Sequence, residues 1–362
     1  MIEKVKISNG QATILAIMVI TGGNLLFLPS IFAKDTLQDG WIASLVGVNI
    51  GVIFVFLYSS LARRFPNLTF AEYSELILGK VFGKLVAFFS YIYFFILVSV
   101  GIRQIGDFIL TQMLPTTPLY VVNLLFISVI VMGVRLGLET FARAAQLCFP
   151  FIIILFISLS VFSLPTVKPE NFLPILETGI RPIFGSAVRF LGFTYFQLIA
   201  LLMIFPSIER KEKRGRSLLS GSYIGGGMLI ILTTLCIGAL GADSVIRQAY
   251  PSYALAKSIY IGDFITRIEV ILAAIWFLTV YFKSTLFFYV LSLGIAQTLK
   301  LNDYRSLAFP LGILTLVYSI AIYPNTIYAL ETEVGWNWFS FGMVIGLFFP
   351  LLLLGVATVR KL

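Results

Sequence analysis

The stretch that decides the fold is Ile20-Thr-Gly-Gly-Asn-Leu-Leu-Phe-Leu-Pro-Ser30, inside the first long apolar run of the chain. Glycine and asparagine are poor helix formers, yet Gly22, Gly23 and Asn24 stand where a membrane-spanning helix should be most regular. Unpaired backbone inside a bilayer is costly, so irregular backbone persists there only when protein or a water-filled cavity surrounds it. The stretch therefore predicts a broken helix in a membrane protein.

The composition of the whole chain agrees with a membrane location. Of its 362 residues, 59% are hydrophobic and 12% are charged, against about 45–50% and about 25% in soluble domains. Apolar runs recur almost to the C-terminus with short polar joints, which predicts one integral membrane domain over 1–362. The first run is expected to be retained, because it is longer than the roughly 7–15 residues of a signal-peptide core.

Residue types exclude several kinds of chemistry. The chain has no histidine, the commonest metal ligand and neutral-pH proton shuttle. Its two cysteines, Cys148 and Cys236, lie in apolar runs and are expected to be buried thiols. Neither a nucleophile with its base nor a Gly-rich phosphate loop is present. We therefore expect no enzyme, no metal and no cofactor, and we interpret the basic segment 209–216 as setting membrane orientation rather than binding nucleic acid.

Ten segments are long enough to cross a bilayer, which takes about 20 apolar residues at about 1.5 Å per residue. If both termini are cytoplasmic, most of the 26 Lys and Arg residues fall on the cytoplasmic side, as the positive-inside rule requires. The expected spans are approximately 11–33, 41–62, 82–111, 119–137, 142–164, 182–206, 217–241, 265–297, 306–324 and 336–358.

A split after the fifth span gives two five-helix repeats, 11–165 and 182–359, and each begins with a weakened helix. In the first repeat the weak patch is 21–24, and in the second Gly192 and Thr194 interrupt the sixth span. Interrupted segments at corresponding positions of two halves are the best sequence pointer to a central binding site. The alternative is that the glycines only let another helix approach closely.

Two such breaks suit a zwitterionic ligand. Free N–H groups at the start of a half-helix favour a carboxylate, and freed carbonyls at the end of a half-helix favour an ammonium or a metal cation. An amino acid offers both charges. We therefore expect the substrate-binding residues to be Thr21, Gly22, Gly23, Asn24, Leu25, Gly192, Phe193, Thr194 and Tyr195.

Several motifs resemble the B subunit of spore germinant receptors, the endospore germination permease family of the amino acid, polyamine and organocation transporter superfamily. They are the broken first helix, the cluster Gly137-Leu-Glu139 with Ala142-Arg143 and Pro150, and Pro206 followed by the basic loop. The resemblance implies an all-α integral membrane protein with the leucine-transporter fold, five plus five inverted helices, and a small-nutrient site between broken helices 1 and 6. It also implies an A subunit and a C lipoprotein as partners, in the inner membrane of the spore.

Lys283 lies near the middle of the eighth span, about 20 Å from either end and beyond the reach of a lysine side chain. A buried ammonium there costs on the order of 2.5–3.5 kcal/mol and indicates a functional residue. In relatives with the implied fold, the first and eighth helices hold a sodium ion, and Ser284 and Thr285 resemble its hydroxyl ligands. We expect Lys283 to replace that sodium and brace the broken helix. A lysine paired elsewhere and a proton-coupling lysine are the alternatives.

Two charge pairs have the i, i+4 spacing that places both residues on one helix face. Arg103 and Asp107 lie near the outer end of the third span, where they either neutralise each other or form a gate or a ligand contact. Glu139 and Arg143 lie on the cytoplasmic side, where we expect a structural clasp.

Three functions fit these features. The first is a receptor subunit that binds a small nutrient, such as the amino acid alanine, between broken helices 1 and 6 and triggers germination through partner subunits. The second is an amino acid permease, with proton coupling left open, and the third is a scaffold with a vestigial site. A receptor and a carrier can share one pocket, so the sequence does not separate the first two.

Overall fold

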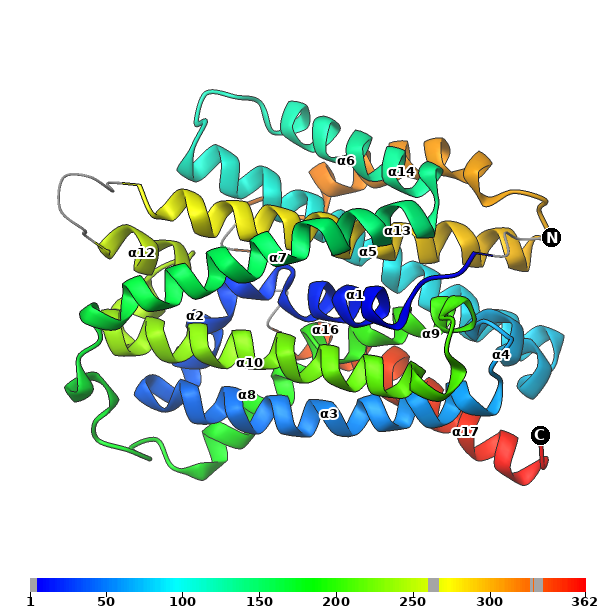
Figure 1. Cartoon of the computed structure of the whole chain (residues 1–362), viewed down its shortest axis with the longest axis horizontal. Coiled ribbons are helices and arrows are strands. Elements are labelled where there is room, and N and C mark those ends of the chain that lie inside the picture. The colour runs from blue at the N-terminus through cyan, green and yellow to red at the C-terminus, as the bar shows by residue number, and fades with distance from the viewer. Residues whose placement is uncertain (1–4, 260–266, 326–327, 329–334) are drawn as a thin grey trace.

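The computed structural model describes residues 5–259, 267–325, 328 and 335–362. Within these residues the chain is helical, apart from one isolated strand-like bridge between Ile7 and Ile208. Figure 1 shows the long helices lying side by side along the longest axis, with both chain termini at the same end of the bundle. The all-helical membrane architecture predicted from the sequence is confirmed.

Most spans are single helices that begin and end within a few residues of the expected boundaries. The last span passes from α16 (Trp336–Met343) through a π-helical turn (Val344–Phe348) into α17 (Phe349–Val359). The others are α3 (Gly40–Arg64), α5 (Lys80–Gln112), α6 (Leu119–Leu136), α7 (Leu138–Ser163), α10 (Arg214–Leu240), α13 (Glu269–Thr298) and α14 (Ala308–Ala321).

The first span consists of two short helices, α1 (Asn9–Thr21) and α2 (Asn24–Thr36), which we call the first broken helix. Between them Gly22 has φ −10° and ψ −117°, so the helix ends there. Among the described residues, nine helical runs are long and apolar enough to span a membrane. One of these nine runs contains both α2 and α3 and has 41 residues. Its length is about 60 Å of helix, which is twice the thickness of the bilayer core. With α1 as the N-terminal half of the first span, the described residues form ten crossings.

The sixth span is interrupted as well, and we call it the second broken helix. It runs from α8 (Ile180–Phe193) through a 3-10 helix (Phe196–Ala200) to α9 (Leu201–Ile204) and a final 3-10 turn. The break falls at Thr194, which has φ −126° and ψ −70°. Gly192 is still helical, so the interruption lies two residues beyond that glycine.

Three short helices lie outside the spans and were not expected from the sequence. α4 (Phe70–Leu78) begins with a capping box in which the Thr69 and Glu72 side chains each bond the other residue's backbone N–H. α11 (Ala242–Arg247) and α12 (Pro251–Ser258) connect α10 towards α13. Figure 1 shows α4 near the termini and α12 at the opposite end, so these helices cover the two ends of the bundle.

Candidate ligand-binding site

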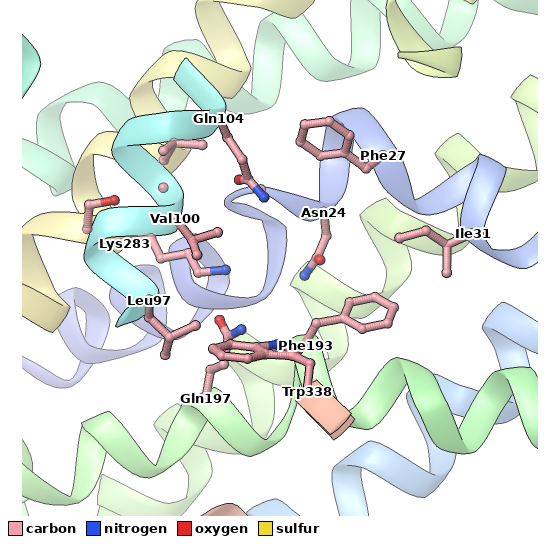
Figure 2. A pocket seen from close by; sticks show the side chains of 14 residues that line it. Asn24, Phe27, Ile31, Leu97, Val100, Gln104, Phe193, Gln197, Lys283 and Trp338 are labelled. Carbon is pink, nitrogen blue, oxygen red and sulfur yellow. The ribbon is translucent and has the colours of Figure 1, made fainter. Parts of the chain in front are cut away.

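A cavity lies where the two broken helices meet, inside the bundle (Figure 2). Its volume is about 60 Å³. Since one water needs about 10–15 Å³ by this measure, the cavity holds roughly four to six waters or one molecule with few heavy atoms. The lining residues are Gly23, Asn24, Phe27, Ile31, Leu97, Val100, Gly101, Gln104, Phe193, Gln197, Val280, Lys283, Ser284 and Trp338.

Four polar side chains from different elements converge on this cavity. Figure 2 shows the amides of Asn24, Gln104 and Gln197 and the ammonium group of Lys283 pointing into it. They come from α2, α5, the second broken helix and α13, while Phe193 and other apolar side chains form much of the remaining wall. A mostly apolar cavity with a few convergent polar groups is the usual form of a small-molecule site.

One side chain joins the two helix breaks. The Asn24 amide nitrogen donates to the Ile20 carbonyl at 2.6 Å and to the Thr194 hydroxyl at 2.9 Å. Asn24 and Thr194 are both buried. Asn24 therefore satisfies a carbonyl next to the first break and ties the second break to it.

The Asn24–Thr194 hydrogen bond can be tested with a double-mutant cycle. Breaking one partner of a buried hydrogen bond costs about 1–3 kcal/mol, so we expect Asn24→Ala and Thr194→Val each to lower thermal stability. Because the two residues share one bond, the double variant should lose less than the sum, with a coupling of about 0.5–3 kcal/mol. Unfolding of the four purified proteins measures this coupling. Strictly additive losses would show that the breaks are not coupled through this bond.

The broken helices are also connected at both ends. At the end that carries the termini, the Ile7 N–H donates to the Ser207 carbonyl at 2.8 Å. At the opposite end, Asp35 of α2 forms an ion pair with Arg189 of α8. Together with Asn24 and Thr194, these contacts fix the two broken helices to each other at three depths.

Arg214 secures the terminal end of the second broken helix. Its guanidinium donates to the carbonyls of Ile208 at 2.7 Å, Pro66 at 2.7 Å and Pro206 at 3.0 Å. The residue is buried, although it belongs to the basic segment 209–216. At least one charge of that segment thus stabilises the fold in addition to any effect on orientation.

Gly22 and Gly23 have close neighbours on α13 and α5. A Cβ atom added to Gly22 would overlap Cδ of Lys283, and one added to Gly23 would lie 2.8 Å from Oε1 of Gln104. The stem of Lys283 therefore lies against the first break. Its Nζ atom lies 5.8 Å from the centre of the Phe287 ring, and Figure 2 shows it at the cavity.

The structure brings five of the predicted site residues together in the cavity lining, and they are Gly23, Asn24, Phe193, Lys283 and Ser284. Thr194 is next to them through its bond with Asn24, and Gly22 contacts the stem of Lys283.

The remaining predicted binding residues lie around the cavity and do not line it. The Thr21 hydroxyl donates to its own helix, at 2.7 Å from the Ile17 carbonyl. Gly192 packs closely against Phe339 of α16. Three others are buried in the core, and they are Leu25, Tyr195, whose hydroxyl donates to the Ser222 carbonyl at 3.3 Å, and Thr285, which lies next to Gly133 of α6.

The two predicted charge pairs form, but outside the cavity lining. Arg103 Nε lies 2.9 Å from Asp107 Oδ1, and the side chains are 6% and 10% exposed. Arg103 also donates to the Ile320 carbonyl at 2.9 Å, so this pair faces the end of α14. Glu139 and Arg143 pair on the surface of α7, with side chains 45% and 68% exposed.

An aromatic cluster packs behind Phe27, on the side of α12. The ring centre of Phe27 lies 5.5 Å from that of Tyr250 and 6.2 Å from that of Trp276, and Phe108 contacts both of these rings. Burial raises the pKa of Tyr250 to about 12, so its hydroxyl stays neutral even near pH 10, where an exposed tyrosine ionises. The cluster holds Phe27 in place as one wall of the cavity.

Gln104, Gln197 and Trp338 line the cavity but were not predicted as binding residues. Gln197 could have been predicted from the sequence, since it is a lone polar residue in an apolar segment just beyond the second break. Gln104 lies beside Arg103 and Asp107, which were predicted from the sequence as a charge pair. The position of Trp338 at the cavity could not be predicted, because nothing in the sequence relates the last span to the broken helices.

In the part of the chain that the structure describes, ten crossings, two broken helices and a polar cavity between the breaks define a membrane protein of the leucine-transporter fold. The chain is similar to MhsT in complex with L-phenylalanine, with a TM-score of 0.69 and 16% identity over 96% of this chain and 87% of that one. It is also similar to Mhp1, a nucleobase-cation-symport-1 family transporter, with a TM-score of 0.65 and 11% identity over 98% and 94%. At these identities the likeness establishes the fold alone.

The family is identified from sequence. The family model described as Spore germination protein matches residues 6–327, so the chain belongs to this family. Two relatives from Bacillus subtilis (strain 168) are spore germination protein KB, 29% identical over 99% of this chain and 96% of that protein, and spore germination protein YndE, 28% identical over 98% and 97%. The resemblance stated from the motifs is confirmed, and the fold and family are those of non-enzymatic membrane proteins.

Proposed function

We propose that this protein is a germinant-receptor subunit that binds a small nutrient, of about the size of alanine, between the two helix breaks. The observation that carries the proposal is the cavity of about 60 Å³ at the point where Asn24 and Thr194 join the breaks. Membership of the spore germination family supports the receptor role. The L-phenylalanine held by MhsT, which shares the fold, supports an amino acid as the ligand class.

A ligand in this cavity would act on the contacts between the broken helices. It would touch α2, α5, the second broken helix and α13 at once, and would therefore favour the arrangement in which these four elements are closest. A ligand shifts a conformational equilibrium only by its difference in affinity for the two states. In the proposed function, an A subunit and a C lipoprotein in the inner membrane of the spore respond to that shift.

The permease alternative is favoured by a second hollow, of about 540 Å³, near the end of the bundle that carries the termini. It is lined by Met203 of the second broken helix and by Tyr289 of α13. Met203 lies six positions beyond Gln197, and Tyr289 lies six positions beyond Lys283, both of which line the cavity. On α13 this interval is about 9 Å, and the residues between are buried. A carrier would have to open this packed wall, whereas a receptor can leave it closed.

Binding and uptake of labelled L-alanine, measured on the same proteoliposomes, separate these functions. We expect saturable binding without saturable uptake, because packed side chains separate the cavity from the hollow. Binding together with saturable uptake would establish the permease instead. Absence of both would overturn an amino acid as the ligand, and absence of binding by any small nutrient would leave the scaffold with a vestigial site.

We further infer that both termini lie in the cytoplasm, since they share one end of the bundle with the basic segment 209–216. In a background with Cys148→Ala and Cys236→Ala, a Glu212→Cys thiol should react only with a membrane-permeant maleimide. A Glu170→Cys thiol at the opposite end should react with an impermeant maleimide in intact cells. The reverse pattern would invert the orientation.

A further inference from the structure

We propose that the ligand carries a carboxylate and that Lys283 supplies the positive charge that binds it. This inference rests on the proposed function, because it takes the cavity between the breaks as the ligand site. Of the 14 residues that line the cavity, Lys283 is the one with a formal charge, and the described lining contains neither Asp nor Glu. The electrostatic character of the site is therefore positive.

The packing of Lys283 directs its charge into the cavity. The residue lies at the middle of the 30-residue helix α13, about 20 Å of helix from either end. Its stem is held against Gly22, where even a Cβ atom would overlap its Cδ, and Figure 2 shows its ammonium group at the cavity. A cation fixed away from bulk water attracts an anion more strongly than one in water does.

The acidic residues of the cavity-forming elements already have positive partners. α2, α5 and α13 each contain one acidic residue, while α8, the 3-10 helix Phe196–Ala200 and α16 contain none. Each of the three forms an ion pair with an arginine, and the pairs are Asp35 with Arg189, Asp107 with Arg103, and Glu269 with Arg267. None of these three acidic residues lines the cavity, so the formal charge of the lining is that of Lys283, which has the sign that a carboxylate requires.

Gln197 indicates the second group of the ligand. Its side-chain oxygen is buried without a hydrogen-bond partner in the protein, and the residue, 3% exposed, lines the same cavity as Lys283. An amide oxygen accepts from an N–H or O–H group, and a buried acceptor left unpaired is costly. The cavity thus fits a small carboxylate that carries a hydrogen-bond donor, such as an α-amino or α-hydroxy acid.

The test compares four probes on the purified full-length protein in detergent, by the shift in melting temperature and by direct titration. The probes are L-alanine, L-lactate, L-alaninamide, which keeps the ammonium but lacks the carboxylate, and glucose. We expect L-alanine and L-lactate to bind, and L-alaninamide to bind at least about tenfold more weakly, a difference of about 1.4 kcal/mol. Equal affinity for L-alanine and its amide would overturn the proposal without any variant.

Variants of the protein then test whether Lys283 supplies the positive charge that binds the carboxylate. Lys283→Met keeps the stem but removes the charge, and should weaken L-alanine at least about tenfold, while Lys283→Arg should keep the preference for L-alanine over its amide. Lys257→Met is the matched control, because Lys257 is exposed on α12, and it should leave affinity unchanged. Unchanged L-alanine affinity in Lys283→Met would overturn the proposal. If the ligand-free variant then also melted at a lower temperature, Lys283 would brace the first break as predicted from the sequence.

Failure of this inference is distinguishable from failure of the proposed function. If glucose binds, the two carboxylates do not, and Gly23→Leu removes glucose binding, the nutrient site stands and the carboxylate assignment falls. If none of the four probes binds, both fall.

Discussion

Gly23→Leu is expected to abolish ligand binding while the protein stays folded in the membrane. Gly23 has φ −57° and ψ −26°, a helical conformation that leucine adopts readily. Its added Cβ would meet only the end of the flexible Gln104 side chain, so the fold should tolerate it. The rest of the leucine would occupy a cavity of about 60 Å³. We expect affinity for L-alanine to fall roughly a hundredfold or more, about 2.8 kcal/mol.

The matched control is Gly227→Leu on α10, where a Cβ atom would have no neighbour within 4 Å. Both variants add the same side chain to a helical glycine, but only one adds it to the cavity. L-alanine titration measures affinity, and membrane abundance with melting temperature measures folding. Normal L-alanine binding by Gly23→Leu would show that the ligand does not bind in this cavity. Loss of the protein itself would return the glycine pair to a role in close helix packing.

The fold could be predicted from the sequence because apolar length and helix propensity are local properties. Ten apolar runs gave the crossings, and the Gly22–Gly23 pair gave the position of the first break. The second break was less certain, because Gly192 stays helical and the chain leaves the helix at Thr194. Thr194 is fixed by its bond with Asn24, 170 residues away, and tertiary contacts of this kind override propensity.

The site was only partly predictable, for a related reason. Lys283 stood out because a charge inside an apolar run is rare. Gln104 and Trp338 did not, because a helix that is apolar all round shows no amphipathic stripe and its rotation cannot be read from the sequence. Arg214 was placed among loop charges, since sequence does not reveal that its guanidinium is enclosed by three carbonyls.

Gly221→Leu should destabilise the protein more than Gly23→Leu or Gly227→Leu does. Gly221 lies on α10, where an added Cβ would be 2.6 Å from the Ala16 Cβ and 2.7 Å from the Thr13 carbonyl oxygen of α1. The carbonyl is backbone, so no side-chain rotation relieves the overlap and the two helices must separate. Small residues let membrane helices pack closely through van der Waals contact. Overpacking costs typically about 1–3 kcal/mol, and we expect the upper end or more, seen as lower abundance and melting temperature.

Gly227→Leu again serves as the control, since it adds the same side chain to the same helix where a Cβ atom meets nothing. Gly221→Leu should therefore fail in folding where Gly23→Leu fails only in binding, which separates the packing glycines from the cavity glycine. A Gly221→Leu protein as abundant and as heat-stable as Gly227→Leu would contradict the close contact of α1 with α10. Because α1 is the N-terminal half of the first broken helix, that outcome would also remove the support that places Gly23 and Asn24 at the cavity.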